Sequence, residues 1–260
     1  MSLRAKKMPL GTVIGISGKG GTGKTLVAAL LIRELSKEFP DASILAIDAD
    51  PDSNLPDALG VSIAASVGEM REALLEEESV TGDKRREFEG KIMEIIYEGD
   101  HYDLLVMGRP EGPGCYCPVN HIIRMVIDTL SKNYDYTVID CEAGLEHLSR
   151  RTTRDVDIML VITDATVKGI LTALRIRKLT DEIDIAIKKI INVANRIPEG
   201  LEAKVREEAR KHGIELHEII PYDPKVAEFD LLGKPVVALP EDSSASVAVR
   251  KIMKMIVGAT

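Results

Sequence analysis

The chain has 260 residues, a formal net charge of −8, and an aliphatic composition with 3 Phe and no Trp. This length suits one large α/β domain or two small ones, and a composition without a break favours a single domain over residues 11–260, after a loose lead-in at 1–10. The acidic balance argues against non-specific nucleic-acid binding, and the lack of an 18-residue apolar run or a signal-like N-terminus predicts a cytoplasmic protein with no stable membrane association.

The first predicted strand, residues 12–16, leads into a glycine-rich loop and then an apolar helical pattern that closes near Phe39. Glycines let several backbone N–H groups converge on one anion, and the helix N-terminus adds partial positive charge. Lys24 supplies a mobile cation for the β- and γ-phosphates, and the Thr25 hydroxyl suits Mg²⁺. We therefore predict a nucleoside triphosphate site formed by Gly18, Lys19, Gly20, Gly21, Thr22, Gly23, Lys24 and Thr25.

The same loop also fits the dinucleotide-binding fingerprint, with Gly18, Gly20 and Gly23 at the three glycine positions and Asp48 as the ribose acid. That interpretation gives no role to the Lys-Thr pair on the first helical turn. The phosphate-loop interpretation needs both residues, and the strand–loop–helix context favours it.

A second predicted strand, beginning near residue 42, ends in Asp48 and Asp50. Because the carboxyl ends of parallel strands face the ligand crevice, we expect both acids beside the phosphates, although two acids around a proline also fit a solvated turn. Residues 66–99 then show two helical patterns, which we interpret as covering helices with solvated charges.

A strand at 102–107 precedes a Gly/Pro-rich segment that contains Cys115 and Cys117. Two thiols at i and i+2 can chelate one soft or borderline metal ion, but they supply only two of the four donors that such an ion requires. The alternatives are two small buried side chains or a redox pair. The third cysteine, Cys141, follows a predicted strand and is expected to be structural.

The remaining pattern continues the alternation of strands and helices. A strand at 134–140 ends in Asp140, which resembles a Walker B acid and would hold Mg²⁺ with Thr25, while Gly144 is a candidate pivot and His147 a surface or packing residue. Further strands are predicted at 157–162, 189–196 and 216–220, with helices at 122–130, 167–182, 201–209 and 249–256, the last packed in the core. Together they predict a single-domain α/β fold with a doubly wound, mostly parallel twisted sheet of about seven to eight strands and helices on both faces.

With Lys19 directly after its first glycine, GKGGTGKT resembles the deviant Walker A loop of the MinD/ParA/nitrogenase-iron-protein class. The resemblance implies ATP/ADP as the nucleotide, a homodimer in which Lys19 reaches the partner's phosphates, and Asp50 as the residue that orients the attacking water. Alternatively, Lys19 adds charge only to its own site. By the same resemblance, the base would be contacted by Asn195, Arg196, Pro221, Tyr222 and Asp223.

Three segments, GKGGTGKT, GCYCPVN and DCEAGLEHL, together resemble the CooC-type ATPases, which deliver nickel to carbon monoxide dehydrogenase or acetyl-CoA synthase. The resemblance implies Ni²⁺ or Zn²⁺ bound by Cys115 and Cys117 from both subunits of the homodimer. Two other functions stay open. An iron–sulfur cluster carrier or electron-transfer ATPase would use the same four thiolates. A spatial organiser of the MinD/ParA kind would bind membrane or DNA, against which the acidic charge and the C-x-C motif both argue.

Overall fold

The computed structural model describes residues 11–70, 84–109, 125–142, 156–182 and 187–258. The predicted lead-in at 1–10, the first part of the helical pattern after residue 70, and the candidates Cys115, Cys117, Gly144 and His147 lie outside these ranges. Their predicted roles stay predictions.

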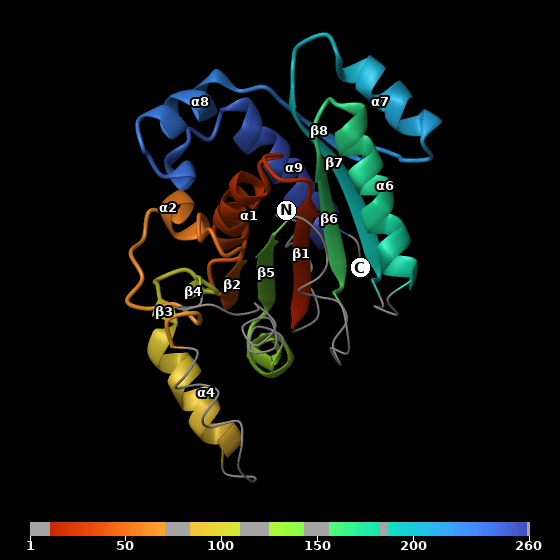
Figure 1. The fold of residues 1–260 in the computed structure, drawn as a ribbon. Coiled ribbons are helices and arrows are strands. Elements are labelled where there is room, and N and C mark those ends of the chain that lie inside the picture. The colour runs from red at the N-terminus through yellow and green to blue at the C-terminus, as the bar shows by residue number, and fades with distance from the viewer. Residues whose placement is uncertain (1–10, 71–83, 110–124, 143–155, 183–186, 259–260) are drawn as a thin grey trace, which may run out of the picture.

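Within the described residues, eight strands form one sheet in the order β3-β4-β2-β5-β1-β6-β7-β8 (Figure 1). All neighbouring strands are parallel except β3 and β4. This confirms the predicted fold class and strand number. The strands are β1 Thr12–Gly18, β2 Ile44–Ala49, β3 Tyr97–Glu98, β4 Asp103–Val106, β5 Tyr136–Cys141, β6 Ile158–Thr163, β7 Lys189–Ile197 and β8 Glu218–Pro221.

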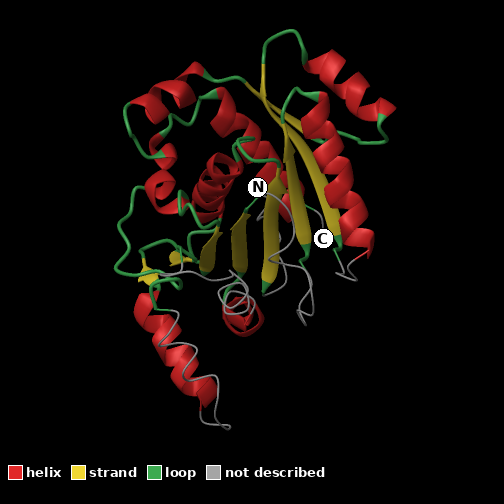
Figure 2. Ribbon diagram, viewed as in Figure 1, coloured by secondary structure: helices red, strands yellow, loops and turns green. Residues whose placement is uncertain are grey.

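Helices flank both faces of the sheet, as Figure 2 shows. They are α1 Lys24–Glu38, α2 Leu55–Leu59, α4 Lys84–Ile95, α6 Val167–Glu182, α7 Glu202–Lys211, α8 Pro224–Leu231 and α9 Ser244–Val257, with 3-10 turns η1 Ser131–Asn133 and η2 Val236–Ala238. Residues 125–130 are also helical, within the helix predicted at 122–130. Helix α6 has the predicted bounds. The edge strand β3 lies in a segment for which only helix was predicted, and α2 and α8 were not predicted, because five to eight residues give too short a period to recognise.

Alternate residues of the central strands enter two different hydrophobic clusters. Ile14 and Ile16 belong to the cluster that includes α1 and α9 on one face, whereas Val13 belongs to the cluster that includes α4 and α6 on the other. This follows from the two-residue period of a strand that is covered on both sides. A third cluster joins α7 to β7 and β8.

Helices α1 and α9 hold the first of these clusters together. Ten consecutive residues of α1, from Leu26 to Leu35, are buried. In α9, the apolar positions Val249, Ile252, Met253 and Ile256 are all buried, which confirms the predicted core packing of this helix. None of the described helices combines the length and the hydropathy that crossing a lipid bilayer requires.

Strand β1 occupies the middle of the sheet, between β5 and β6. From β1 the chain moves outward to β2 and β4, returns to β5, and then passes to the opposite side through β6, β7 and β8. Such a reversal of winding opens a crevice at the carboxyl ends of the strands. The carboxyl ends of β1, β2, β4 and β5 therefore lie along one edge of the sheet, with α2 and α8 beside it (Figure 1).

Candidate functional site

The glycine loop joins β1 to α1 in a conformation that only glycine adopts without strain. Gly21 and Gly23 have φ angles of 78° and 84°, in the left-handed region. A Cβ on Gly18 would lie 2.2 Å from the Ile162 carbonyl oxygen of the neighbouring strand β6. The loop thus requires glycine at these positions to turn sharply and to pass close to the sheet, leaving its backbone amides available for an anion at the start of α1.

Asn195, near the end of β7, holds the phosphate loop through a hydrogen bond to its backbone. Its side-chain Nδ2 donates to the Thr22 carbonyl oxygen at 2.7 Å, and its Oδ1 accepts from the Arg196 backbone N–H at 2.8 Å. The Arg196 guanidinium donates to the Gly21 carbonyl oxygen at 3.2 Å. Arg196 has a φ of 58°, and the pairing of β7 with β8 is irregular at this point. The bulge therefore presents both side chains to the phosphate loop, and contact with the base stays a prediction for both.

Lys24, Thr25 and Asp140 meet at the base of the loop. Lys24 is 7% exposed, and the Thr25 hydroxyl hydrogen-bonds the Asp140 carboxylate. Burial raises the pKa of Asp140 to about 6, while the Thr25 hydrogen bond and the Lys24 charge oppose the rise. In this arrangement the Lys24 ammonium can bind a phosphate, and the Asp140 carboxylate lies beside it.

The Asp140 and Thr25 oxygens also fit Mg²⁺. Asp140 Oδ1 is buried and, among the described residues, has no hydrogen-bond partner. Carboxylate and hydroxyl oxygens are the hard ligands that Mg²⁺ prefers. When bound with a nucleotide, Mg²⁺ would neutralise charge on the β- and γ-phosphates.

Asp48 and Asp50 serve different parts of the loop after β2. Asp48 is fully buried, and its two carboxylate oxygens accept from the backbone N–H groups of Asp50 at 3.0 Å and Leu55 at 2.9 Å. Burial, reinforced by repulsion from Asp140, raises its pKa to about 7. Asp48 therefore shapes the loop, whereas Asp50 lines the cavity in front of the phosphate loop. The predicted role of Asp50 in aligning water stays a prediction.

Lys19 is paired inside its own subunit. Its Nζ lies 3.5 Å from Asp164 Oδ2, and the two side chains are 40% and 28% exposed. Asp164 follows β6 directly and also accepts from the Thr166 backbone N–H at 2.9 Å. Partial burial acts to raise the pKa of Asp164, but the Thr166 hydrogen bonds and the Lys19 charge outweigh it and hold the pKa below its ordinary value.

A cavity of about 1020 Å³ opens in front of the phosphate loop. Its described walls come from the loop itself, the segment after β2, α2, and the stretch from α8 into η2. The charged side chains that line it are Lys24, Asp50, Asp52, Asp57, Glu142, Arg196, Asp230 and Lys234. Acids outnumber bases among them, so a triphosphate here depends on the backbone amides and on a metal cation for charge balance.

A smaller pocket of about 190 Å³ lies beside the cavity, and the two share Leu26, Arg196 and Asp230. The predicted base contacts Asn195, Arg196, Pro221, Tyr222 and Asp223 all line it. The Asp223 carboxylate, however, accepts from the backbone N–H groups of Lys225 and Ala245, at 3.0 and 3.1 Å. It therefore caps α8 and ties it to the start of α9.

This arrangement agrees with comparisons to known proteins. A model of the CobQ/CobB/MinD/ParA nucleotide binding domain matches residues 13–236. The chain belongs to this family. The chain is 48% identical, over 94% of its length and 98% of the relative's, to an ATP-binding protein of Methanocaldococcus jannaschii whose function is uncharacterised.

Two further proteins, one similar in sequence and one similar in fold, indicate the type of nucleotide-binding protein. The ATPase is 31% identical to the carbon monoxide dehydrogenase accessory protein CooC of Rhodospirillum rubrum, over 85% of its own chain and 87% of CooC. Its fold is similar to the crystal structure of a ParA family ATPase from Chlorobium tepidum, with a TM-score of 0.71, 22% identity, and coverage of 96% and 98% of the two chains. The protein is thus an ATP-binding ATPase of the ParA/MinD type.

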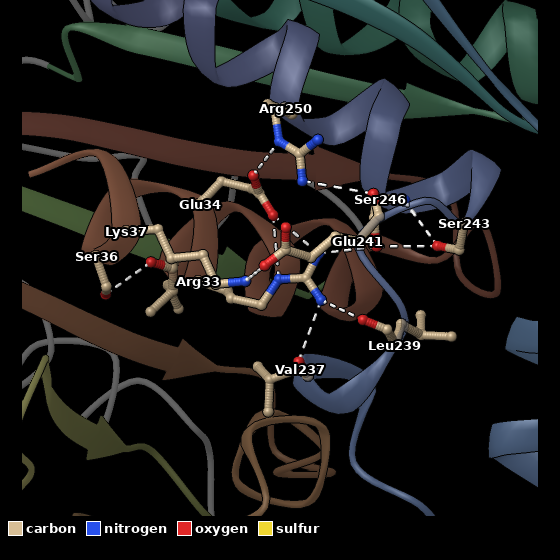
Figure 3. A network of polar contacts seen from close by, with 11 residues as sticks. Arg33, Glu34, Ser36, Lys37, Val237, Leu239, Glu241, Ser243, Ser246 and Arg250 are labelled. Atoms are coloured by element: carbon tan, nitrogen blue, oxygen red, sulfur yellow. Dashed lines mark hydrogen bonds and ion pairs between the residues drawn. The ribbon is translucent and has the colours of Figure 1, made fainter.

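A buried polar network fixes one wall of the ATPase cavity (Figure 3). Arg33 on α1 donates to the carbonyl oxygens of Val237 at 3.1 Å and Leu239 at 2.7 Å, and to Ser246 Oγ at 2.8 Å. The neighbouring Glu34 accepts from both Arg33 and Arg250. Because η2 and the residues before it line the cavity, the network ties this wall to the phosphate-loop helix. Mutual pairing makes burial of these charges tolerable.

The cysteines of the ATPase divide between described and undescribed segments. Cys141 is buried at the end of β5, and burial raises its thiol pKa to about 12, as expected of a structural cysteine. Cys115 and Cys117 lie outside the described residues. Within the described part, no group of three or more His, Cys, Asp or Glu side chains is placed to hold a metal ion.

Sequence patterns missed several residues of this site. Asp164, Arg109 and Lys234 were not singled out, although Asp164 follows a strand that adjoins β1, and residues at such carboxyl ends face the crevice. That rule could have found Asp164. No local pattern indicates Lys234, because it approaches the cavity through the unpredicted helix α8.

Proposed function

We propose that this ATPase is a metallochaperone that inserts nickel into carbon monoxide dehydrogenase or acetyl-CoA synthase. ATP binding draws two copies together, with Lys24 on each copy's own phosphates and Lys19 crossing to the partner's. Cys115 and Cys117 of both copies then hold one Ni²⁺, or Zn²⁺ in its place. Hydrolysis, with water aligned by Asp50, loosens the dimer and releases the metal to the client.

One observation carries the proposal: β4 delivers the chain toward the C-x-C motif at the same edge of the sheet as the phosphate loop. The Met107 backbone N–H donates to the Asp48 carbonyl oxygen at 2.8 Å, and Arg109 forms an ion pair with Asp52, which lines the nucleotide cavity. Because the C-x-C motif follows this strand end in sequence, we infer that its thiols respond to nucleotide and meet their counterparts in a face-to-face dimer.

The likeness to CooC supports the same conclusion. CooC is named as an accessory protein of carbon monoxide dehydrogenase, and the identity extends over most of both chains. Thiolates select soft or borderline metals, which suits nickel as cargo. Metal transfer requires that metal affinity differ between nucleotide states, because a nucleotide with no differential effect cannot drive release.

Equilibrium dialysis with Ni²⁺, with and without a non-hydrolysable ATP analogue, tests this function. We expect one Ni²⁺ per two chains with the analogue, and dimerisation measured by light scattering that strengthens with nickel. The double variant Cys115→Ala/Cys117→Ala should lose nickel binding and nickel-dependent dimerisation while it keeps ATP binding. Loss of ATP binding in this variant would instead place the thiols in the nucleotide site.

The same preparation separates the two other functions. Protein purified without oxygen should contain iron and acid-labile sulfide if the thiolates carry an iron–sulfur cluster, and neither of them if the thiolates carry nickel or zinc. A spatial organiser would cosediment with lipid vesicles or DNA in the presence of ATP. The apolar face of α9 is buried in the core, so this helix offers no surface for a membrane.

A further inference from the structure

One wall of the nucleotide cavity is formed where α2 and α8 end, close to each other (Figure 1). Each helix is followed by a glycine with a left-handed φ, 70° at Gly60 and 61° at Gly233. A Cβ on Gly60 would lie 2.9 Å from Pro235 Cβ, so the two ends are in close contact. The carbonyl groups at helix carboxyl ends carry partial negative charge, and Asp57 and Asp230 add to it. An anion near this wall therefore requires a cation.

Lys234 is placed at this wall by the turn that ends α8. Its backbone N–H donates to the Phe229 carbonyl oxygen at 2.9 Å, and the Gly233 N–H donates to the Asp230 carbonyl oxygen at 3.3 Å. These two bonds form a Schellman motif, in which the residue after the glycine folds back onto the helix. Lys234 Nζ accordingly lies 5.4 Å from the centre of the Phe229 ring, within the range of a cation–π contact. The turn and the ring together limit where the ammonium group can lie.

The Phe229 ring is anchored to the core that carries the phosphate loop. None of the residues of α8 is buried, but Val226 and Phe229, one turn apart, pack against the main hydrophobic cluster. Leu26, on the first turn of α1, belongs to the same cluster and also lines the cavity. The aromatic platform under Lys234 and the helix that follows the phosphate loop are thus supported by one core.

The positive charge of Lys234 is available to a ligand. Two other cations line the described walls of the cavity, and both have partners in the protein: Arg196 donates to the Gly21 carbonyl oxygen, and the charge of Lys24 acts on Asp140. In the part of the chain that the structure describes, Lys234 forms no ion pair with a carboxylate, unlike Lys225 on the same helix, which pairs with Asp242. A bound nucleotide would supply the missing anion.

We propose that Lys234 binds the α-phosphate of the nucleotide. The phosphate loop is predicted to hold the β- and γ-phosphates, and the smaller pocket is predicted to hold the base. The ribose and the α-phosphate must then lie where the pocket meets the cavity, and the residues shared there include Leu26 and Asp230. Lys234 follows Asp230 by one turn. The α-phosphate is the anionic group of that stretch, and a lysine ammonium is a compact cation with three donors. This assignment concerns ATP binding alone and does not depend on the metal cargo.

Isothermal titration of the full chain with Mg²⁺ and a non-hydrolysable ATP analogue, and separately with Mg²⁺ and ADP, tests the assignment. Lys234→Gln should weaken both nucleotides equally, by about three- to ten-fold, because both carry the α-phosphate and the contact is exposed. Raising the salt from about 50 to about 500 mM should shrink this difference, because exposed charges are screened. Lys234→Arg should keep most of the affinity. Lys225→Gln is the matched control, because it removes an exposed lysine of the same helix, and it should bind both nucleotides as the wild type does.

A second variant tests the aromatic platform. Phe229→Leu removes the ring but keeps an apolar side chain against the core, so it should weaken both nucleotides by less than Lys234→Gln does. In the Lys234→Gln background the same change should cause no further loss, because Phe229 acts only by positioning the ammonium group. An equal loss in both backgrounds would contradict this role of the ring.

Three results would overturn the assignment. Unchanged affinity in Lys234→Gln would remove Lys234 from the site, a loss confined to the ATP analogue would place it on the γ-phosphate, and a loss independent of salt would mean that the shape of the turn matters and the charge does not. The nickel measurements described above are separate from this test. If one Ni²⁺ binds per two chains while Lys234→Gln has no effect, the metallochaperone function stands and the assignment fails. If nickel does not bind while Lys234→Gln weakens both nucleotides, the reverse applies.

Discussion

Two lysines of one loop, five residues apart, occupy contrasting environments. Lys24 is 7% exposed, on the first turn of α1 beside the buried Asp140. Lys19 has a side chain that is 40% exposed and pairs at 3.5 Å with Asp164, whose side chain is 28% exposed. The carboxylates beside the two lysines also differ. Burial raises the pKa of Asp140 to about 6, whereas the pKa of the more exposed Asp164 is below its ordinary value.

This contrast means that Lys24 is held in place, whereas Lys19 can exchange its partner at little cost. Displacing Lys24 would leave Asp140 as a buried charge without its nearest cation, which is costly. Displacing Lys19 breaks a solvent-screened pair that is worth at most about 1 kcal/mol. The loop thus has one buried lysine, which we predict to bind its own subunit's nucleotide, and a second that can leave Asp164 at little cost, as the proposed dimer requires.

The largest expected effect follows from removal of the fixed lysine. Lys24→Ala should weaken ATP binding at least about 30-fold, since loss of a buried, hydrogen-bonded cation costs about 2–5 kcal/mol. Isothermal titration with a non-hydrolysable analogue measures the affinity. An affinity within a factor of three of wild type would show that Lys24 contributes no more than Lys19 does, and the distinction between the two lysines would be wrong.

The next largest effect is expected from loss of the hydrogen bond between Asn195 and the phosphate loop. Asn195→Ala should lower the free energy of unfolding by about 1–3 kcal/mol without any nucleotide, because it leaves the buried Thr22 carbonyl oxygen without the hydrogen bond from Asn195. Urea denaturation measures the loss. Asn192→Ala, on the same strand, removes a hydrogen bond to the Glu215 carbonyl oxygen at 3.0 Å, so it should also lower stability but should leave nucleotide affinity unchanged. If Asn195 serves only the base, stability will be unchanged and only the preference for ATP over GTP will fall.

Removal of the movable lysine should act on assembly alone. Lys19→Ala should abolish ATP-dependent dimerisation in light scattering and reduce ATP turnover with it, while ATP affinity of the single chain stays within about three-fold of wild type. The reason is that its cation is partnered elsewhere in the single subunit. A large loss of affinity with dimerisation retained would mean that Lys19 adds charge only to its own site.

The smallest effect is expected from the carboxylate that holds Lys19. Asp164 has a folded-state pKa below its ordinary value of 3.8, so its stabilising contribution is present above that pH and is lost as pH falls through the folded pKa. Asp164→Asn should therefore lower stability by no more than about 1 kcal/mol near neutral pH. Thermal unfolding at several pH values should show the gap to wild type constant above about pH 5 and closing toward pH 3. A gap that widens in acid would contradict the shift.

Sequence patterns predicted the sheet, the phosphate loop and Asp140 because each is encoded locally. A strand covered on both sides reads as an apolar run, and a phosphate loop needs its glycines, lysine and threonine within eight residues. These signals fixed where Lys24, Thr25 and Asp140 would meet, since parallel strands deliver their carboxyl ends to one edge.

The partners of these residues could not be predicted in the same way. Asn195 meets Thr22 across 173 positions of sequence, and Arg109 meets Asp52 across 57. Neither contact produces a periodic pattern in the sequence, because both depend on the order of the strands. The position of Asn195 also depends on a bulge in β7. Asn195 was predicted from a family resemblance to contact the base, and only the fold reveals that its amide also holds the loop backbone.

The Arg33 network of Figure 3 has a mechanical consequence. Rotating or sliding α1 would break the bonds from Arg33 to Val237, Leu239 and Ser246 together, and would expose a buried ion pair. The phosphate-loop helix, the wall after α8 and the C-terminal helix are therefore expected to travel as one rigid block. Any movement that nucleotide drives is then expected on the other side of the cavity, in the segment between β2 and α2 that carries Asp50 and Asp52.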